Sequence, residues 1–497
     1  MSRKGQRQHR RLQQSAPSSG QKPEMNLAPR DLEAMAEELV TYHALFQDLF
    51  QRREQREWSA FYLRGQLAEI ARKTVEPMVL ALKGPDLAAI RAGQQFLGEG
   101  AWADGPILAR HQRLVAESLG EPDGMVIFDG SGFPKQGTHS VGVAPQYCGA
   151  LGKIANCQQG VFAAYVSRKG YTFLDRRLYM PEEWFDAAHA SLRQRYGVPP
   201  TRQFQTEPQL ALEMLHALVE RAVVPFAWVV ADEHYGMCPG FLDGVAAEGK
   251  WYFAEVPSST PVWVGEPPVE PPGAGPMGRP RKHARVAAGT PRAEEVRQIA
   301  AQLPARAWRR YTIKEGSKGP IAADFACLRV TRARRGRPGL AGWLVLRRSL
   351  GEKREVKYFL SNAPACCPPA TLVRISGLRW PVETAIEEAK GELGMDHYET
   401  RTWRGWHHHM TQTLLAHHFL VRLRLQLKKS PGVDRGPSSG AAGGRLAPPP
   451  TERGRGPGTR ALLSGAQLRR LSLPSPAHRA PPSPARTSAR EGHKVSL

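Results

Sequence analysis

Two apolar stretches of this chain each end in an aspartate, and a glutamate follows them much later in a helical pattern. The stretches are Met125–Asp129 and Phe226–Asp232, and the glutamate is Glu383. Short apolar runs of this length are typical of buried strands. If the two strands are neighbours in an open sheet, both aspartates emerge at the same edge, and a later helix can bring the glutamate to them. This order predicts a mixed α/β core with three acids at one place.

The rest of the pattern divides the chain into six segments. Helical spacing of apolar residues dominates before residue 120, strands prevail from Met125 onward, and Pro, Gly, Ser, Ala and Arg dominate after Lys429. We predict a disordered basic tail (1–25), a helical domain (26–120) that is either a DNA-binding domain or a dimerisation or packing module, the first part of the core (121–256), a β-rich insertion with a Pro/Arg-rich loop (257–370), the second part of the core with the third acid (371–428), and a disordered basic tail (429–497). A ribonuclease H-like core has the same order of elements as this chain from Met125 onward: three strands, a helix, a fourth strand, an insertion and a further helix.

Charge indicates the class of partner. The chain has a formal net charge of +23, of which residues 1–25 contribute +5 and residues 427–497 contribute +10. A basic body with strongly basic ends favours a polyanion, and nucleic acid is the first candidate. No apolar run approaches 18 residues and no secretory signal is present, so we expect a cytoplasmic protein that meets no membrane. The six cysteines show no zinc-binding spacing.

The helix that carries the third acid has a charged face. Arg379, Glu383, Glu387 and Lys390 follow one another at four, four and three residues, which places them on one stripe. Mg²⁺ takes hard oxygen ligands and keeps several waters, so a few carboxylates and a substrate phosphate suffice to bind it. The same stripe is also compatible with a solvated helix face, and Glu387 and Glu388 are alternatives to Glu383 as the third acid.

These motifs together resemble the DDE transposases of bacterial insertion sequences, in the subgroup with a Tyr-Arg-Glu-Lys signature. Arg379, Glu383 and Lys390 match the spacing of the last three members, whereas Ser376 stands where the tyrosine is expected. The sequence around Asp129 and the segment 394–406 also resemble the family, although the family often has Asp-Glu at the first acid and this chain has Asp129-Gly130. The similarity runs from about residue 30 to residue 428.

The resemblance implies a chemistry and a set of site residues. Asp129, Asp232 and Glu383 would be both the catalytic and the metal-binding triad, holding Mg²⁺ or Mn²⁺ as two ions. Double-stranded DNA, as element ends and target, would be the substrate, and a second protomer would join in a paired-end complex. Arg379, Lys390, Arg279, Arg281, Lys135, Arg404 and Trp406 are the predicted DNA contacts. Arg279 and Arg281 belong to Gly278–Lys282, which resembles an AT-hook, although a solvated loop has the same composition.

Two other functions remain open from the sequence. The chain could be a DNA-binding remnant of a transposase without activity, since the composition after Lys429 is also what a shifted reading frame in GC-rich DNA would produce. It could also be a metal-dependent nuclease that cuts DNA without joining strands.

Overall fold

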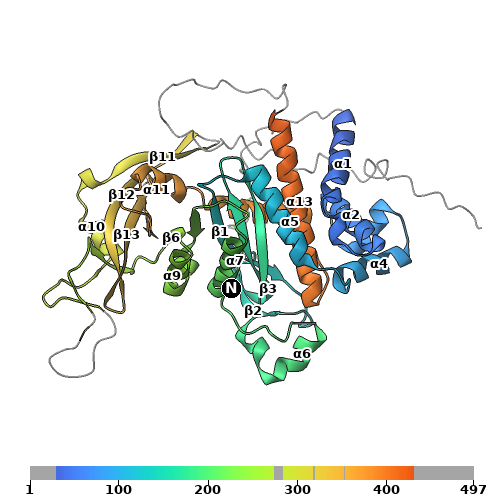
Figure 1. The fold of residues 1–497 in the computed structure, drawn as a ribbon, viewed down its shortest axis with the longest axis horizontal. Coiled ribbons are helices and arrows are strands. Elements are labelled where there is room, and N and C mark those ends of the chain that lie inside the picture. Colours follow the sequence, from blue (N-terminus) through green and yellow to red (C-terminus); the bar gives the residue numbers. More distant parts are fainter. Residues whose placement is uncertain (1–28, 272, 274–283, 317–318, 352, 430–497) are drawn as a thin grey trace, which may run out of the picture.

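The computed structural model describes residues 29–271, 273, 284–316, 319–351 and 353–429. The two predicted tails, residues 1–25 and almost all of 429–497, lie outside the described residues, as do Arg279 and Arg281. Figure 1 shows the described part as a central sheet with helices on both faces, the insertion at one end and the N-terminal helices at the other.

The central sheet contains the predicted pair of acid-bearing strands. It has the order β10-β7-β12-β13-β14-β6-β5-β1-β3-β2, with β4 paired to β3 and β11 to β12. The strands of the core are β1 (Met125–Pro134), β2 (Ala144–Cys148), β3 (Lys153–Val166), β4 (Tyr171–Tyr179), β5 (Trp228–Ala231) and β6 (Trp251–Glu255). β1 runs parallel to β5 and antiparallel to β3, so the sheet is mixed. This arrangement is that of a ribonuclease H-like α/β fold, as the sequence predicts.

Side chains of β1 alternate between two separate cores. Met125 and Ile127 face one core, which also contains residues of α12 (Trp380–Leu393) and α13 (Trp403–Lys429). Val126 and Phe128 face the other, which is covered by α7 (Glu207–Arg221) and α9 (Pro239–Ala247). Because successive residues of a strand point to opposite faces, helices cover both sides of β1, and α7 lies in front of the sheet in Figure 1.

The predicted insertion adds strands to the same sheet instead of forming a sheet of its own. Its strands are β7 (Pro261–Val264), β8 (Val269–Glu270), β9 (Arg285–Val286), β10 (Glu294–Glu295), β11 (Arg309–Gly316), β12 (Gly319–Arg334), β13 (Arg337–Arg348) and β14 (Val356–Ser361), with the helix α10 (Val296–Gln302) among them. β14 pairs antiparallel with β6, with Leu360 opposite Ala254, and so continues the core sheet outward. Among the described strands, β8 and β9 form a pair apart from this sheet.

The N-terminal region is helical and packs against α13. It consists of α1 (Pro29–Ala44), α2 (Arg53–Leu67), α3 (Val75–Leu82), α4 (Leu87–Gly98) and α5 (Asp104–Leu119). Their apolar residues share a core with Leu415, Phe419 and Leu423 of α13. One face of α13 therefore contacts the sheet core and another contacts the N-terminal helices, which explains why this long helix is buried around most of its circumference.

The segment that leads to and includes Glu383 forms two helices. α11 (Pro369–Ser376) ends at Gly377, and α12 begins at Trp380. Pro381 does not interrupt a helix, because it lies in the first turn of α12, where its missing N–H has no partner to lose. α12 ends at Gly394, whose φ of 67° is the left-handed conformation common after a helix.

The remaining short helices connect these elements. They are α6 (Ala190–Arg195) and α8 (Glu233–Gly236), with the 3-10 helices η1 (Gln47–Leu49), η2 (Glu182–Phe185), η3 (Ala187–His189) and η4 (Ala305–Ala307). No helix in the described ranges is long and apolar enough to cross a membrane.

Candidate active site

The two aspartates lie at matching positions on neighbouring parallel strands. β1 and β5 are in register through Ile127 and Val230, and each aspartate comes two residues further along its strand. Asp129 stays within β1, opposite Phe162 of β3, whereas Asp232 ends β5 and caps α8. The Asp232 Oδ1 accepts a hydrogen bond of 3.2 Å from the backbone N–H of Tyr235. The sheet thus brings the two carboxylates to one edge.

The third acid reaches this edge from α12. Glu383 lies in the first turn of α12, on the side of the sheet to which alternation directs Asp129. The Arg379 guanidinium pairs with the Glu383 carboxylate and also lies 3.9 Å from the Asp129 Oδ2. One cation of this chain therefore lies between two of the predicted metal ligands.

Asp129 is in an unfavourable environment for a charged carboxylate. Burial, then the charge of Asp232 and, least, the charge of Glu383 raise the pKa of Asp129, which is about 7. The charge of Arg379 and a hydrogen bond from the Gly130 N–H act in the opposite direction. Like-charged carboxylates that are held together in this way are stabilised when a cation joins them.

The three acids have the oxygen ligands that a divalent cation prefers and lie at one edge of the sheet. Their carboxylates are not yet close enough together to coordinate one ion. Within the described ranges, no group of three or more His, Cys, Asp or Glu side chains stands close enough to hold an ion as placed. The Arg379 guanidinium lies between two of these acids, paired with Glu383 and 3.9 Å from the Asp129 Oδ2. The donor set consists of carboxylate oxygens, which Mg²⁺ and Mn²⁺ prefer. Binding of an ion by all three acids requires Arg379 to move.

The alternative third acids have other environments. Glu388 pairs with Arg424 and His417 and accepts a hydrogen bond from the Tyr171 hydroxyl. These partners lower the pKa of Glu388 to about 2 in spite of its burial. Glu387 is exposed, and neither residue acts on the Asp129 carboxyl as Glu383 does. The geometry therefore favours Glu383.

The predicted DNA-contacting lysines lie close to the acids but have intramolecular partners. The Lys390 Nζ donates to the Gly132 carbonyl at 3.1 Å and lies 5.0 Å from the centre of the Phe133 ring. The Lys135 Nζ donates to the Tyr398 carbonyl and lies 3.3 Å from the centre of its ring. Burial lowers the pKa of Lys135 to about 8. Both lysines anchor the segment that follows Asp129.

The two predicted contacts on α13 differ in exposure. Arg404 is exposed, and its guanidinium donates to the Glu99 carbonyl at 3.0 Å. Trp406 is fully buried beside Phe162. A DNA contact by Trp406 is thus incompatible with its position, because an aromatic ring that fills the core has no face available to a base. Ser376 is also buried, and its hydroxyl donates to the Val373 carbonyl.

A groove opens beside the third acid. It has a volume of about 400 Å³ and is bordered by Arg379, Trp380 and Glu383 at one end and by insertion strands at the other. Arg347 and Lys357 line it together with Glu255 and Glu355, and the Lys357 Nζ lies 2.9 Å from the Glu255 carboxylate. The insertion thus supplies one wall of a groove of mixed charge beside Glu383.

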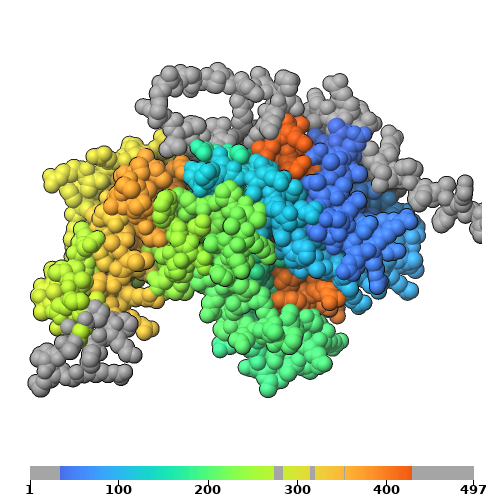
Figure 2. Space-filling view, in the orientation of Figure 1, coloured from blue at the N-terminus to red at the C-terminus, as the bar shows by residue number. Residues whose placement is uncertain are grey.

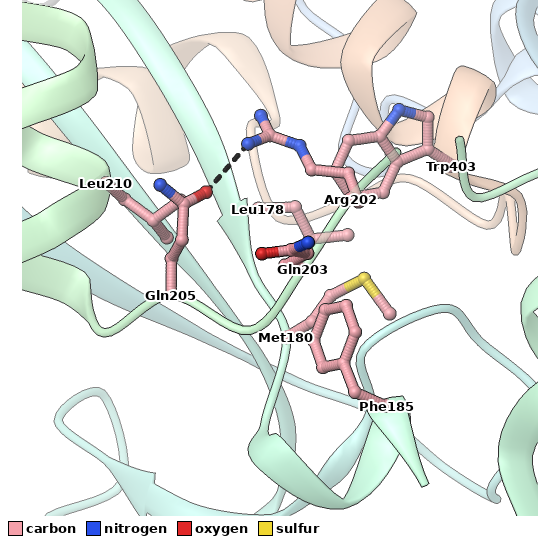
Figure 3. A pocket seen from close by; sticks show the side chains of 8 residues that line it. All are labelled: Leu178, Met180, Phe185, Arg202, Gln203, Gln205, Leu210 and Trp403. Atoms are coloured by element: carbon pink, nitrogen blue, oxygen red, sulfur yellow. Dashed lines mark hydrogen bonds between the residues drawn. The ribbon is translucent and has the colours of Figure 1, made fainter. Parts of the chain in front are cut away.

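A second hollow lies elsewhere and is too small to matter for this chemistry. It has a volume of about 10 Å³, which is the size of one water. Figure 3 shows Arg202 and Gln205 joined by a hydrogen bond of 2.8 Å at its rim, with Met180 and Phe185 below and Trp403 at the side.

The sequence patterns did not single out a fourth carboxylate, that of Glu207 at the start of α7. Its Oε2 would lie 2.9 Å from a Cβ placed on Gly130, next to Asp129. A local signal exists, since Thr206-Glu207-Pro208-Gln209 is a helix start with a capping box. Nothing in that signal shows which strand the helix start will meet.

Comparison with known proteins identifies the family. Comparison with curated proteins gives no significant match. Among solved structures, the NurA nuclease from Sulfolobus solfataricus is similar at 10% identity and a TM-score of 0.24, over 57% of this chain and 85% of that one. A similarity so weak carries no argument about function.

The family of DDE superfamily endonucleases matches residues 45–320, which is more than half of the chain. The matched range contains Asp129 and Asp232 and ends before Glu383. Membership implies a nuclease that acts on nucleic acid and depends on divalent metal. The chain belongs to the DDE superfamily endonucleases.

Proposed function

We propose that this endonuclease is the transposase of an insertion sequence, which cuts DNA at the ends of its element and joins those ends to target DNA. The observation that supports this proposal most is the meeting of Asp129, Asp232 and Glu383 at one edge of the sheet. Their carboxylates come from segments far apart in the chain. No covalent protein–DNA intermediate is required, so the absence of a nucleophilic Ser or Tyr in the triad is no obstacle.

The reaction consists of two substitutions at phosphorus. A water oxygen bonds to the phosphorus at the element end as the bond to the 3′ oxygen breaks, which leaves a free 3′-hydroxyl. That oxygen then bonds to a phosphorus of the target as the target's own 3′ oxygen leaves. Mg²⁺ or Mn²⁺, held by Asp129, Asp232 and Glu383, would supply Lewis acidity to the attacking oxygen and offset charge on the phosphate.

The protein's own groups would orient the DNA. Arg379 lies at the end of the groove, where its planar fork suits a phosphate. Arg347 and Lys357 line the same groove and would hold the strand along the insertion. Lys390 would hold the backbone next to Asp129 through its contact with Gly132. We assign the recognition of element ends to the N-terminal helical domain, residues 26–120, and expect a second protomer in the paired-end complex.

One experiment separates this function from its alternatives. The full chain is incubated with Mg²⁺, labelled element-end DNA and a supercoiled target, and products are resolved on denaturing gels. Joined products support the transposase. Cleavage without joining identifies a nuclease alone, and binding without cleavage identifies a remnant. An Asp129→Asn variant serves as the control, since it should bind DNA but yield neither product.

A further inference from the structure

The backbone of Gly130 is closely covered by two polar side chains. A Cβ at this position would lie 2.9 Å from the Glu207 Oε2 and 2.9 Å from the Gln159 Nε2. Contacts this short essentially do not occur for real Cβ atoms, so a larger residue at this point would displace the ends of both side chains from their present positions. The missing side chain beside Asp129 thus makes room for the carboxylate of another element.

Glu207 approaches from the face of the sheet opposite to Glu383. It is the first residue of α7, which packs on the core shared by Val126 and Phe128. Glu383 is on α12, which packs on the core shared by Met125 and Ile127. Helices of both layers therefore deliver an acid to the edge at which Asp129 lies.

The Glu207 carboxylate has no direct partner. Throughout the part of the chain that the structure describes, it forms no hydrogen bond and no ion pair, and the charge that offsets it is that of His234. Glu213 on the same helix, in contrast, pairs with Arg177 and Arg202. Leaving a half-buried carboxylate without a hydrogen bond is costly unless a ligand completes it.

A buried hydroxyl without a partner points to the same place. Tyr235 is 1% exposed, and its hydroxyl has no hydrogen-bond partner among the described residues. Besides burial, the charges of Glu207, Asp129 and Asp232 act on this hydroxyl and raise its pKa. Most buried polar groups of proteins are hydrogen-bonded, so an unpaired one beside three acids indicates a missing ligand or water.

We propose that Glu207 is a fourth carboxylate of the metal centre, which holds a divalent cation or its bound water together with Asp129 and Asp232. This assignment rests on the proposed function, because it presumes that the three acids bind metal. Gly130 then acts as a spacer that admits Glu207, and Tyr235 donates its hydroxyl to a ligand on the ion.

Binding of Mn²⁺ to the full-length protein tests the assignment without any measurement of activity. Free Mn²⁺ is measured by electron paramagnetic resonance for the wild type and for Glu207→Gln, Asp129→Asn and Glu220→Gln. Glu220 is the matched control, since it is on α7 but exposed. We expect Glu207→Gln to weaken Mn²⁺ binding at least fivefold, Asp129→Asn to weaken it more, and Glu220→Gln to leave it unchanged.

A second variant displaces the Glu207 side chain without changing Glu207 itself. Gly130→Ala should displace the Glu207 carboxylate and weaken Mn²⁺ binding to a similar extent, and the double variant should be no weaker than either single one. Circular dichroism and thermal unfolding in EDTA show whether each variant is folded.

The outcomes separate the two proposals. Wild-type affinity in folded Glu207→Gln, with weakened binding in Asp129→Asn, overturns the role of Glu207 and leaves the triad intact. Wild-type affinity in Asp129→Asn, or no Mn²⁺ binding by the wild type, overturns the proposed metal centre itself.

Discussion

Asp129 carries the largest electrostatic cost among the acids of the site. It is mostly buried, faces Asp232 and Glu383, and has one compensating cation, Arg379. A carboxyl in this situation prefers to be protonated, which is why its pKa rises to about 7. The folded protein is therefore strained at this residue until a cation arrives, and two measurements follow from that strain.

The first measurement is of the stability of the metal-free protein as a function of pH. Because the pKa of Asp129 is higher in the folded protein than in the unfolded chain, the cost is absent near pH 4 and fully present above pH 7. We expect Asp129→Asn to unfold in EDTA at pH 8 with a free energy about 1–4 kcal/mol higher than the wild type. The difference should shrink toward zero at pH 4. A variant that is less stable than the wild type at pH 8 would contradict this electrostatic account.

The second measurement is of metal binding when Arg379, the cation between the acids, is replaced. Since Arg379 pairs with Asp129 and Glu383, an incoming metal must displace it. We expect Arg379→Gln to bind Mn²⁺ about 2–10 times more tightly in calorimetric titration, which corresponds to about 1 kcal/mol for a partly exposed ion pair. Arg379→Lys keeps the charge and should remain closer to the wild type. Weaker binding by Arg379→Gln would mean that the guanidinium supports the metal centre instead of competing with it.

Among the elements, α13 depends most on neutral buried groups. His408, His409 and His418 are buried in it, and their side chains bond to groups of other segments, among them the Leu97 carbonyl and the Tyr62 and Tyr42 hydroxyls. Burial lowers the pKa of His408 to about 4 and that of His409 to about 3. The five histidines of this helix are therefore packing groups that join it to the N-terminal helices and the sheet.

This helix should make the protein sensitive to acid. Histidines that are neutral in the folded state and charge near their ordinary pKa of 6.5 in the unfolded chain favour unfolding as the pH falls. We expect the free energy of unfolding to fall by several kcal/mol between pH 6.5 and pH 4, more steeply than at any higher pH. Urea titrations at a series of pH values across this range measure the free energy of unfolding. His409→Gln should reduce the slope, and a flat profile would show that these rings are already charged.

Trp406 offers a test of element packing against a surface role. It is fully buried between α13 and β3, so Trp406→Ala should lower the free energy of unfolding by about 3–5 kcal/mol. Arg404→Ala, two residues away and exposed, should change stability by less than about 0.5 kcal/mol. A stable Trp406→Ala protein with weakened DNA binding would restore the contact predicted from the sequence.

For the molecule as a whole, patterns within one element were predictable and contacts between elements were not. The apolar runs before Asp129 and Asp232 predicted two buried strands, and the structure has β1 and β5 there. The prediction of a shared edge required these strands to be neighbours, and their parallel register meets that condition. Trp406 was misjudged because a polar, His-rich neighbourhood suggests a surface, whereas its ring packs beside Phe162 of β3 in the core of the sheet.

Two further contacts between elements could not be predicted from the sequence, one in the insertion and one at the site. Nothing in the β-rich segment indicates that β14 pairs with β6, so its union with the core sheet required the tertiary structure. Glu207 was missed for the same reason, because its nearness to Gly130 depends on how α7 lies across β1. Figure 2 shows how the insertion and the N-terminal helices form opposite ends of the molecule. The core that holds the acids lies between them.

The most direct measurement of the central claim is the anomalous diffraction of crystals soaked in Mn²⁺. The account predicts an anomalous peak bounded by the carboxylates of Asp129, Asp232 and Glu383, with the Arg379 guanidinium moved away from Asp129. A peak that avoids these residues, or Arg379 still between the acids at saturating Mn²⁺, would contradict it.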